Sequence, residues 1–406
     1  MNKKALWTTG YAFLNIAYFA AFCTVHACAA VFLMSRGFTN TQVGMLLAIA
    51  NITSALFQPF IADVIDKKGW LTNRRFILIS CTVILIGSLM LRFITDSKPV
   101  IFIVYAIIYM IQFAYQPVMT ALCFEYRKKG CDIVYGLARG LGSAGFAVTS
   151  AFIGRAVEAK GADLLPAVTV IIMAVSAAAV FFYRPSGKEK TAEAAEVTEG
   201  TEKSHGKVTD FFREYPAFLL FVIASICFFF AHNMINDFMI QIIRALGGGE
   251  TELGYSNFLQ AILELPVMAL IGFVLRKVSP AKLLVFSGAA FFVKILILIF
   301  ARNMVWMFVS QSFQLFAYAV FIPAGAYYVS HTMAENDQVK GQAYVTSAIT
   351  IGGVFSNLLS GIILDNLGMR PMLITGTAVC FVGVLISFAA LRSPDRKGDQ
   401  PYEYRS

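Results

Sequence analysis

Residues 281–300 read AKLLVFSGAAFFVKILILIF, an apolar run in which only Lys282 and Lys294 carry charge. A helix of this length is about 30 Å long, which matches the hydrocarbon thickness of a bilayer. Lipid offers no partner for backbone N–H and C=O groups, so a chain crossing it as a single segment must be helical. The stretch therefore predicts a transmembrane helix with one lysine deep inside the membrane.

The whole chain shares this character. Its 406 residues are 58% hydrophobic and 14% charged, with a mean hydropathy of +0.69, whereas a soluble protein carries about 25% charged residues. We predict an all-α membrane protein with twelve spans and no signal peptide, because the first apolar run is too long for one. The expected spans lie near 7–34, 42–65, 75–94, 99–124, 134–156, 164–184, 216–244, 253–275, 281–300, 304–330, 341–364 and 371–391.

Lysine and arginine gather in alternate loops, as the positive-inside rule expects of cytoplasmic loops. The loop after the second span holds Lys67, Lys68, Arg74 and Arg75. Both termini are therefore predicted to be cytoplasmic. The net charge of +9 is explained by this topology, so we expect no nucleic-acid partner.

A charged, polar segment at 185–213 divides the spans into six and six. We predict an N-terminal bundle at 1–184, a cytoplasmic linker at 185–213, a C-terminal bundle at 214–392 and a cytoplasmic tail at 393–406. The halves are weak repeats: Pro59 and Pro266 lie 207 residues apart, and Pro117 and Pro323 lie 206 apart. A constant offset indicates a parallel duplication.

Two stretches carry a family resemblance. GMLLA at 44–48 and LFQPF at 56–60 closely resemble the lactose permease group of oligosaccharide/proton symporters. This resemblance implies the major facilitator fold, with two pseudo-symmetric six-helix bundles. Ala62 stands where the family's motif usually has glycine. The motif's conformational loop is matched by Asp66, Lys67 and Gly69.

The second stretch, YGLARGLGSAGF at 135–146, looks like the sugar-binding fifth helix of the same permeases. There an arginine hydrogen-bonds sugar hydroxyl groups and an aromatic ring stacks on the sugar. The resemblance gives these roles to Arg139 and Phe146. The glycines of this stretch also suit close helix packing.

The chain departs from lactose permease elsewhere. Ala121 replaces a sugar-binding glutamate, and Gln314 and Ala317 occupy the positions of a histidine and of the proton-linked glutamate. Lys294 occupies an arginine position. The resemblance therefore implies a different substrate and a relocated proton site, and it extends to nucleoside and phenylpropionate permeases.

Ionisable residues inside spans are costly and mark functional candidates. Glu264 precedes Pro266, which frees a backbone carbonyl group, and burial favours the neutral form of a carboxyl group. Lys294 needs a carboxylate partner, for which Glu264 and Asp237 are candidates. His232 and Asp237 lie with Asn233 on one helical stripe. We assign proton coupling to Glu264, Lys294, Asp237 and His232; the structural alternative is a set of interhelical contacts.

Neutral hydrogen-bonding side chains in the spans are typical of a site for a polyhydroxylated solute. Each one alone also fits an ordinary helix–helix contact. Besides Arg139 and Phe146, we assign substrate binding to Asn51, Gln112, Gln116, Gln311, Gln314, Asn233 and His26.

No nucleotide, metal or hydrolase motif occurs, so the sequence predicts no enzyme, no cofactor and no metal. We predict a monomeric transporter of the bacterial inner membrane that takes up a sugar or oligosaccharide together with protons. An aromatic-acid or nucleoside permease and a drug/proton exporter remain open, and sodium could replace the proton.

Overall fold

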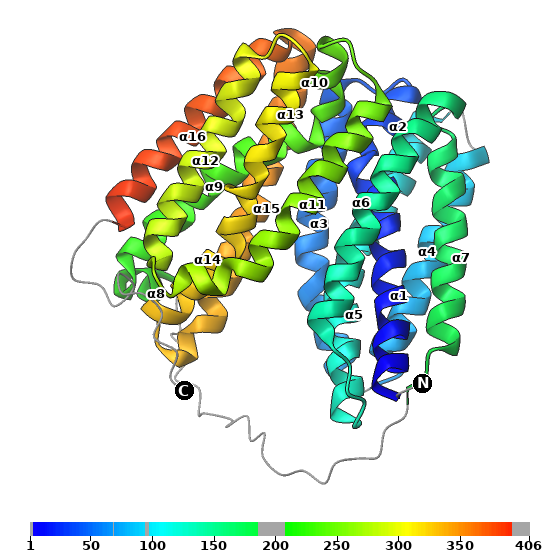
Figure 1. Ribbon diagram of the computed structural model, residues 1–406. Helices are drawn as coiled ribbons and strands as arrows, with labels where there is room; N and C mark the ends of the chain where they lie inside the picture. Colours follow the sequence, from blue (N-terminus) through cyan, green and yellow to red (C-terminus); the bar gives the residue numbers. More distant parts are fainter. Residues whose placement is uncertain (1–2, 68, 94–96, 186–207, 392–406) are drawn as a thin grey trace. The chain divides into compact units, whose positions relative to one another are not determined.

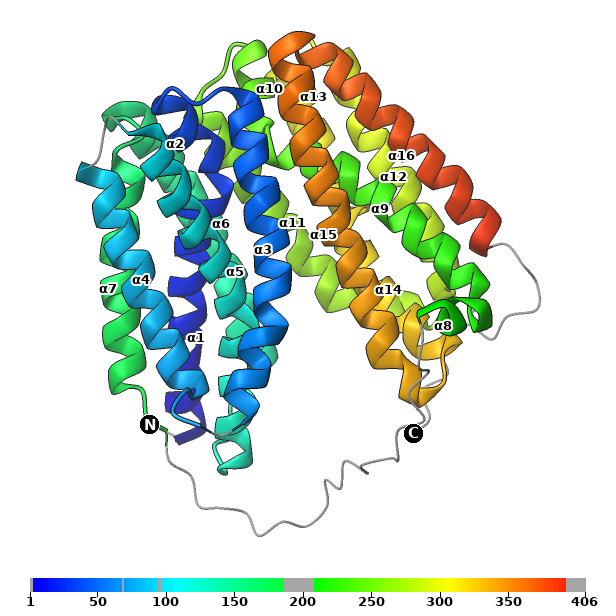
Figure 2. The ribbon, with the colours of Figure 1, turned by 180° about the vertical axis from the view of Figure 1, so that it is seen from behind.

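The computed structural model describes residues 3–67, 69–93, 97–185 and 208–391, and all regular elements in them are helices (Figures 1 and 2). They form two compact units, the first from residues 1–195 with 248–262 and the second from 196–247 with 263–406. Most of the expected linker and all of the tail at 393–406 lie outside the described residues. The end of the linker forms the short helix α8 (Val208–Glu214).

The first unit has its helices packed around α1, which lies against α6 and α7, while α4 packs on both α5 and α7. The N-terminal part of α11 (Glu250–Leu275) also belongs to this unit. The other elements of the first unit are α1 (Lys3–Phe22), the π-helix η1 (Cys23–Ala27), α2 (Ala29–Ser35), α3 (Asn40–Asp66), α4 (Asn73–Phe93), α5 (Lys98–Lys128), α6 (Tyr135–Lys160) and α7 (Leu164–Phe182).

The second unit is centred on α9, which packs against α12, α15 and α16. It also contains α8 and the C-terminal part of α11. The other elements of the second unit are α9 (Pro216–Asp237), α10 (Met239–Ala245), α12 (Pro280–Phe300), α13 (Met304–Ser312), the 3₁₀ turn η2 (Phe313–Leu315), α14 (Tyr318–Thr332), α15 (Glu335–Asn366) and α16 (Met369–Leu391).

Within the described residues, ten helical segments are long and apolar enough to cross a membrane. The other two expected spans, 134–156 and 253–275, form α6 and α11, each 26 residues long. The number of twelve spans and the cytoplasmic placement of the termini stay predictions.

Three expected spans are interrupted, where the sequence predicted one helix each. The first contains the π-turn at Cys23–Ala27. The seventh breaks at Phe238, between α9 and α10. The tenth breaks after η2 at Ala317, whose ψ of −94° is not helical. Interruptions at membrane depth are tolerated where protein groups satisfy the backbone, and here Ser287 Oγ donates to the carbonyl oxygen of Ala317 at 2.7 Å.

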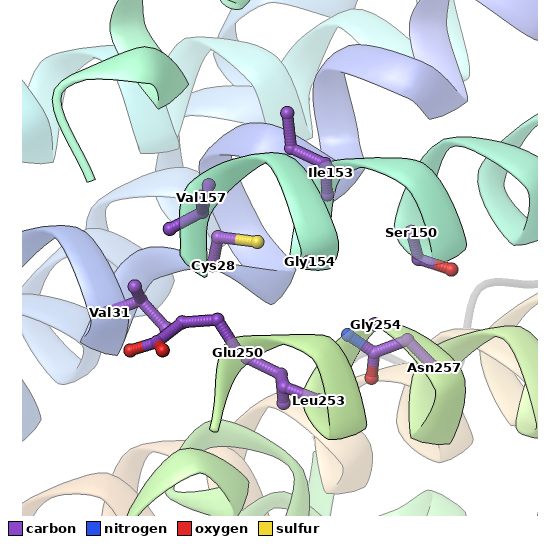
Figure 3. A pocket seen from close by; sticks show the side chains of 10 residues that line it. All are labelled: Cys28, Val31, Ser150, Ile153, Gly154, Val157, Glu250, Leu253, Gly254 and Asn257. Atoms are coloured by element: carbon purple, nitrogen blue, oxygen red, sulfur yellow. The ribbon is translucent and has the colours of Figure 1, made fainter. Parts of the chain in front are cut away.

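Glycines set how closely two helix pairs of the first unit approach. A Cβ atom on Gly142 or Gly145 would meet α1 at Phe19 or Ile16, whereas Gly140 faces open space. Gly154 of α6 meets Gly254 of α11 so closely that a Cβ on either would strike backbone oxygen of the other helix. Figure 3 shows this crossing, with a small pocket beside it. Small residues at such positions permit backbone contact between helices.

Candidate functional site

A chain of hydrogen bonds in the second unit links three side chains assigned from the sequence. Gln314 Nε2 donates to Glu264 Oε1 at 2.9 Å. Lys294 Nζ donates to Gln314 Oε1 at 2.8 Å. The Gln314 amide thus joins the carboxyl group and the ammonium group. The sequence expected Lys294 to meet Glu264 or Asp237, and the structure places a glutamine in the link to Glu264.

The three residues of this hydrogen-bonded relay lie on different kinds of element. Glu264 lies on α11 and Lys294 on α12, but Gln314 lies on the 3₁₀ turn η2, beside the break at Ala317. Lys294 is wholly buried, and Ser310 Oγ donates to its backbone oxygen at 2.6 Å. A buried charge is tolerated only when hydrogen-bonded or paired. The buried Lys294 ammonium group is therefore compensated through the hydrogen bond to Gln314.

The polar stripe on α9 divides into different environments. His232 Nε2 lies 2.9 Å from Asn236 Nδ2, and its ring stacks on Tyr318 at 5.1 Å. Lys294 lies near enough to His232 to interact with it electrostatically. Asn233 and Asp237 are half-buried. His232 is therefore the member of this stripe that interacts with the relay through Lys294.

Gln311, also assigned to substrate binding, is wholly buried on α13. Its Nε2 atom contacts the sulfur of Met239 at 3.9 Å. Its Oε1 atom has no hydrogen-bond partner among the described residues. Gln311 thus lies beside the α9–α10 break with an unused acceptor.

In the first unit, Arg139 is held on α6 by two neighbours. Its Nη1 atom donates to Ser143 Oγ at 3.0 Å, and its guanidinium group lies 4.1 Å from the ring centre of Phe19. Both interactions fix the direction of the side chain and leave further N–H donors of the fork for a solute. The i, i+4 spacing of Arg139 and Ser143 could have predicted this bond.

Aromatic rings surround His26, which lies in the π-turn η1. Its ring is 4.2 Å from Phe22 with an interplanar angle of 8°, 3.8 Å from Tyr109 and 4.4 Å from Phe113. Both ring nitrogens are buried without a hydrogen-bond partner among the described residues. Phe146 joins this aromatic cluster through Phe22 at 6.3 Å. Buried polar groups without partners point to a function or to bound water, and π-turns are frequent at functional sites.

The remaining neutral residues of the first unit are partly brought together. Gln112 is wholly buried on α5, where both of its amide atoms lack partners in the described structure. Tyr18 donates to the Gln112 backbone oxygen at 3.1 Å. Gln116 and Asn51 are half-buried on α5 and α3. The structure gives Gln112 the clearest unused hydrogen-bonding capacity of the three.

The conformational loop lies at the end of α3. Lys67 Nζ pairs with Asp63 Oδ2 at 2.6 Å, while Asp66 and Gly69 are exposed. The sequence missed Asp63 as the partner, although the i, i+4 spacing indicates such a pair.

Among the described residues, no group of three or more His, Cys, Asp or Glu side chains could hold a metal. None of the seven cysteines, all of which lie in the described part of the chain, forms a disulfide bond. In the second unit, Gln314 links the Glu264 carboxyl group to the Lys294 ammonium group by hydrogen bonds. In the first unit, the aromatic rings around His26 offer faces on which a planar ring can stack.

Comparisons with known proteins place these features in a family. The family described as MFS_1 like matches residues 9–374. Sucrose permease of Escherichia coli is 23% identical over 314 residues, which span 73% of this chain and 71% of that protein. The uncharacterized transporter YwbF of Bacillus subtilis (strain 168) is 23% identical over 324 residues, spanning 79% and 76%. The solved structure of the nucleoside transporter NupG is similar to this chain, with a TM-score of 0.74 at 14% sequence identity, and the match covers 96% of this chain and 98% of that chain. This similarity shows a shared fold.

Proposed function

Since this chain belongs to the MFS_1 like family and is a secondary transporter of the major facilitator type, we propose that it takes up a sugar or oligosaccharide together with protons by alternating access. It is a multi-pass membrane protein and not an enzyme. The proposal rests above all on the relay in which Gln314 bonds both Glu264 and Lys294.

The residues of the first unit favour a polyhydroxylated solute with a ring. Arg139 presents a pre-oriented fork of donors, which suits hydroxyl oxygens. The aromatic cluster of Phe22, Phe113 and Phe146 supplies faces on which a sugar ring stacks. Gln112 adds an amide that can donate and accept. The weak similarity to sucrose permease supports the same class.

The relay favours a proton as the coupling ion. In the charged state, the Glu264 carboxylate accepts from Gln314, whose carbonyl group accepts from Lys294. Proton uptake by Glu264 removes its charge and weakens the bond with Gln314. The positive charge of Lys294 is then less well compensated, and η2 can shift at the neighbouring break at Ala317. Protonation thereby changes the relative free energies of two conformations.

The test is substrate-induced proton uptake by purified protein in proteoliposomes. Sugars, nucleosides and aromatic acids are added in turn to a weakly buffered suspension, and external alkalinisation is recorded. Sucrose-like sugars are expected to give the signal, and Glu264→Gln is expected to abolish it while solute exchange persists. Accumulation against a gradient by Glu264→Gln would refute the assigned proton site.

Nucleosides are the second candidate. The specific observation is the aromatic cluster around His26, because planar bases stack on such rings. The fold likeness to a nucleoside transporter is compatible with it. Alkalinisation with nucleosides and not with sugars would select this candidate, whereas signals with aromatic acids alone would favour an organic-anion permease. Proton movement in the opposite direction with an apolar cation would indicate an exporter.

A further inference from the structure

Three cationic side chains from distant parts of the sequence gather at one end of the first unit. Arg36 is the C-cap residue of α2, Arg92 lies in the last turn of α4, and Lys98 begins α5. Asp163, the N-cap residue of α7, contributes a carboxylate that pairs with both arginines. These helix ends lie away from the N-terminus of the chain (Figure 2). We call the four residues the basic corner.

Arg36 forms the buried part of the basic corner. Its Nη2 atom donates to Asp163 Oδ1 at 2.8 Å and to the backbone oxygen of Leu91 at 3.3 Å. Its guanidinium group lies 5.3 Å from the ring centre of Phe32. The side chain is only 7% exposed, and its Nε atom has no hydrogen-bond partner among the described residues. These contacts hold one positive charge at a fixed position.

Arg92 and Lys98 form the exposed part of the basic corner. The Arg92 side chain is 46% exposed, and its Nη1 atom lies 3.9 Å from Asp163 Oδ2, near the upper limit for an ion pair. Lys98 Nζ donates to the backbone oxygen of Gly37, directly after Arg36 in the chain. A guanidinium group has five N–H donors and an ammonium group has three. Both side chains therefore keep donors that these contacts do not use.

The basic corner carries more positive than negative charge. Among its four residues, three cations face one carboxylate, which leaves an excess of two positive charges. The predicted topology places this end of the bundle outside the cytoplasm, where the positive-inside rule does not favour lysine and arginine. Topology therefore does not explain the cluster. An anionic ligand would balance the excess charge.

Apolar surface borders the basic corner along α4. Leu89, Met90 and Phe93 are exposed, and they lie with Arg92 inside the expected span 75–94. Leu89 precedes Arg92 by three residues, so the two share one face of the helix. A cationic side chain near the end of a span extends to the headgroup region while its stem stays in the hydrocarbon. A ligand here therefore meets positive charge beside a lipid-facing surface.

We propose that the basic corner binds the phosphate group of an anionic phospholipid, whose acyl chains lie against α4 at Leu89 and Phe93. The planar fork of arginine matches phosphate oxygens, and basic sites between transmembrane helices bind anionic headgroups. A zwitterionic lipid is disfavoured, because its own ammonium group meets the excess positive charge. None of these residues belongs to the relay or to the aromatic cluster, so the proposal does not depend on the proposed transport activity.

Native mass spectrometry of the purified full-length protein in detergent tests this site by counting bound lipids. Phosphatidylglycerol and phosphatidylcholine with identical acyl chains are titrated separately, and the dissociation constant of the first bound lipid is measured. We expect phosphatidylglycerol to bind about fivefold more tightly or better, since each lysine or arginine near a headgroup contributes about this factor. Inorganic phosphate in excess should not displace it, because phosphate lacks acyl chains.

Three variants localise the binding. The double change Arg92→Gln and Lys98→Gln removes the two exposed cations and should weaken phosphatidylglycerol binding by about fivefold or more, with phosphatidylcholine binding unaffected. Asp163→Asn removes the competing carboxylate and should strengthen phosphatidylglycerol binding. Arg302→Gln is the matched control, because Arg302 is an exposed arginine between two expected spans of the second unit. This control should leave both dissociation constants unchanged.

If a variant does not fold, a photoreactive phosphatidylglycerol is cross-linked to the unsubstituted protein. Peptide mapping is then expected to find the label within residues 86–93 or 98–103. Equal affinities for the two lipids, an unchanged affinity in the double variant, displacement by inorganic phosphate, or labels confined to other segments would each overturn the proposal. An equal loss in Arg302→Gln would overturn it as well, since the preference would then come from surface charge in general.

Discussion

Gln314 donates to Glu264 at 2.9 Å from the same amide whose oxygen accepts from Lys294 at 2.8 Å. The amide cannot rotate by half a turn without presenting N–H groups to the ammonium group. Its orientation is therefore fixed by the charged groups on both sides. A change in the charge of Glu264 alters the hydrogen bond of Lys294 through Gln314, which lies on the 3₁₀ turn η2.

Gln314→Leu should uncouple transport, because leucine can serve neither charged neighbour. We expect substrate-induced proton uptake to fall at least tenfold while exchange of labelled solute continues. Proteoliposome alkalinisation and exchange are measured on the same preparation. Gln311→Leu is the comparison, since Gln311 is a buried glutamine of the same segment that contacts Met239 and not the relay. Because Gln311 is assigned to substrate binding, its KM is expected to rise, whereas its proton-to-solute ratio should stay normal. A normal proton-to-solute ratio in Gln314→Leu would show that the relay is structural.

Arg139→Lys should weaken solute binding although the positive charge is kept. Lysine lacks the planar fork, and hydrogen bonds to charged groups contribute about 1.5–3 kcal/mol, so KM should rise about 10- to 150-fold. Initial uptake rates at several solute concentrations measure this. Arg155→Lys on the same helix is the control, because Arg155 is stacked on Tyr255, and its KM should stay within about twofold. Equal effects of both changes would contradict a direct role for Arg139.

Much of the fold could be predicted, because apolar runs long enough to span a bilayer must form helices. The interruptions of the first, seventh and tenth expected spans could not be predicted. Phe238 and Ala317 are followed by ordinary helix-forming residues, and no glycine or proline marks either break. The π-turn around His26 likewise has no local signal. These breaks result from packing within each unit, which overrides local propensity.

The sequence named Glu264 as a candidate partner of Lys294, but it did not reveal the glutamine that links the two residues. Intramembrane cost singles out Glu264 and Lys294 one by one, but the bond that joins them passes through Gln314, 50 and 20 residues away along the chain.

Gly154→Leu should impair both folding and transport, because even a Cβ at this position strikes the carbonyl oxygen of Glu250. Overpacking of this kind costs about 1–3 kcal/mol, and forced separation of α6 from α11 should reduce the uptake rate. Thermal unfolding and uptake are both measured. Gly140→Leu, on the same helix but facing open space, is expected to be nearly neutral. Equal effects at the two glycines would mean that the close crossing is unimportant.

His26→Phe should separate stability from function. Phenylalanine fits among Phe22, Tyr109 and Phe113 and removes two buried nitrogens without partners, each of which costs about 1–3 kcal/mol. The melting temperature should therefore stay the same or rise. If His26 contacts solute or a proton, the uptake rate should nevertheless fall at least tenfold, as expected where function is maintained at the expense of stability. Phe113→Leu, which removes a ring and keeps His26, should lower the melting temperature instead. Unchanged uptake in a stabilised His26→Phe protein would assign this histidine to packing alone.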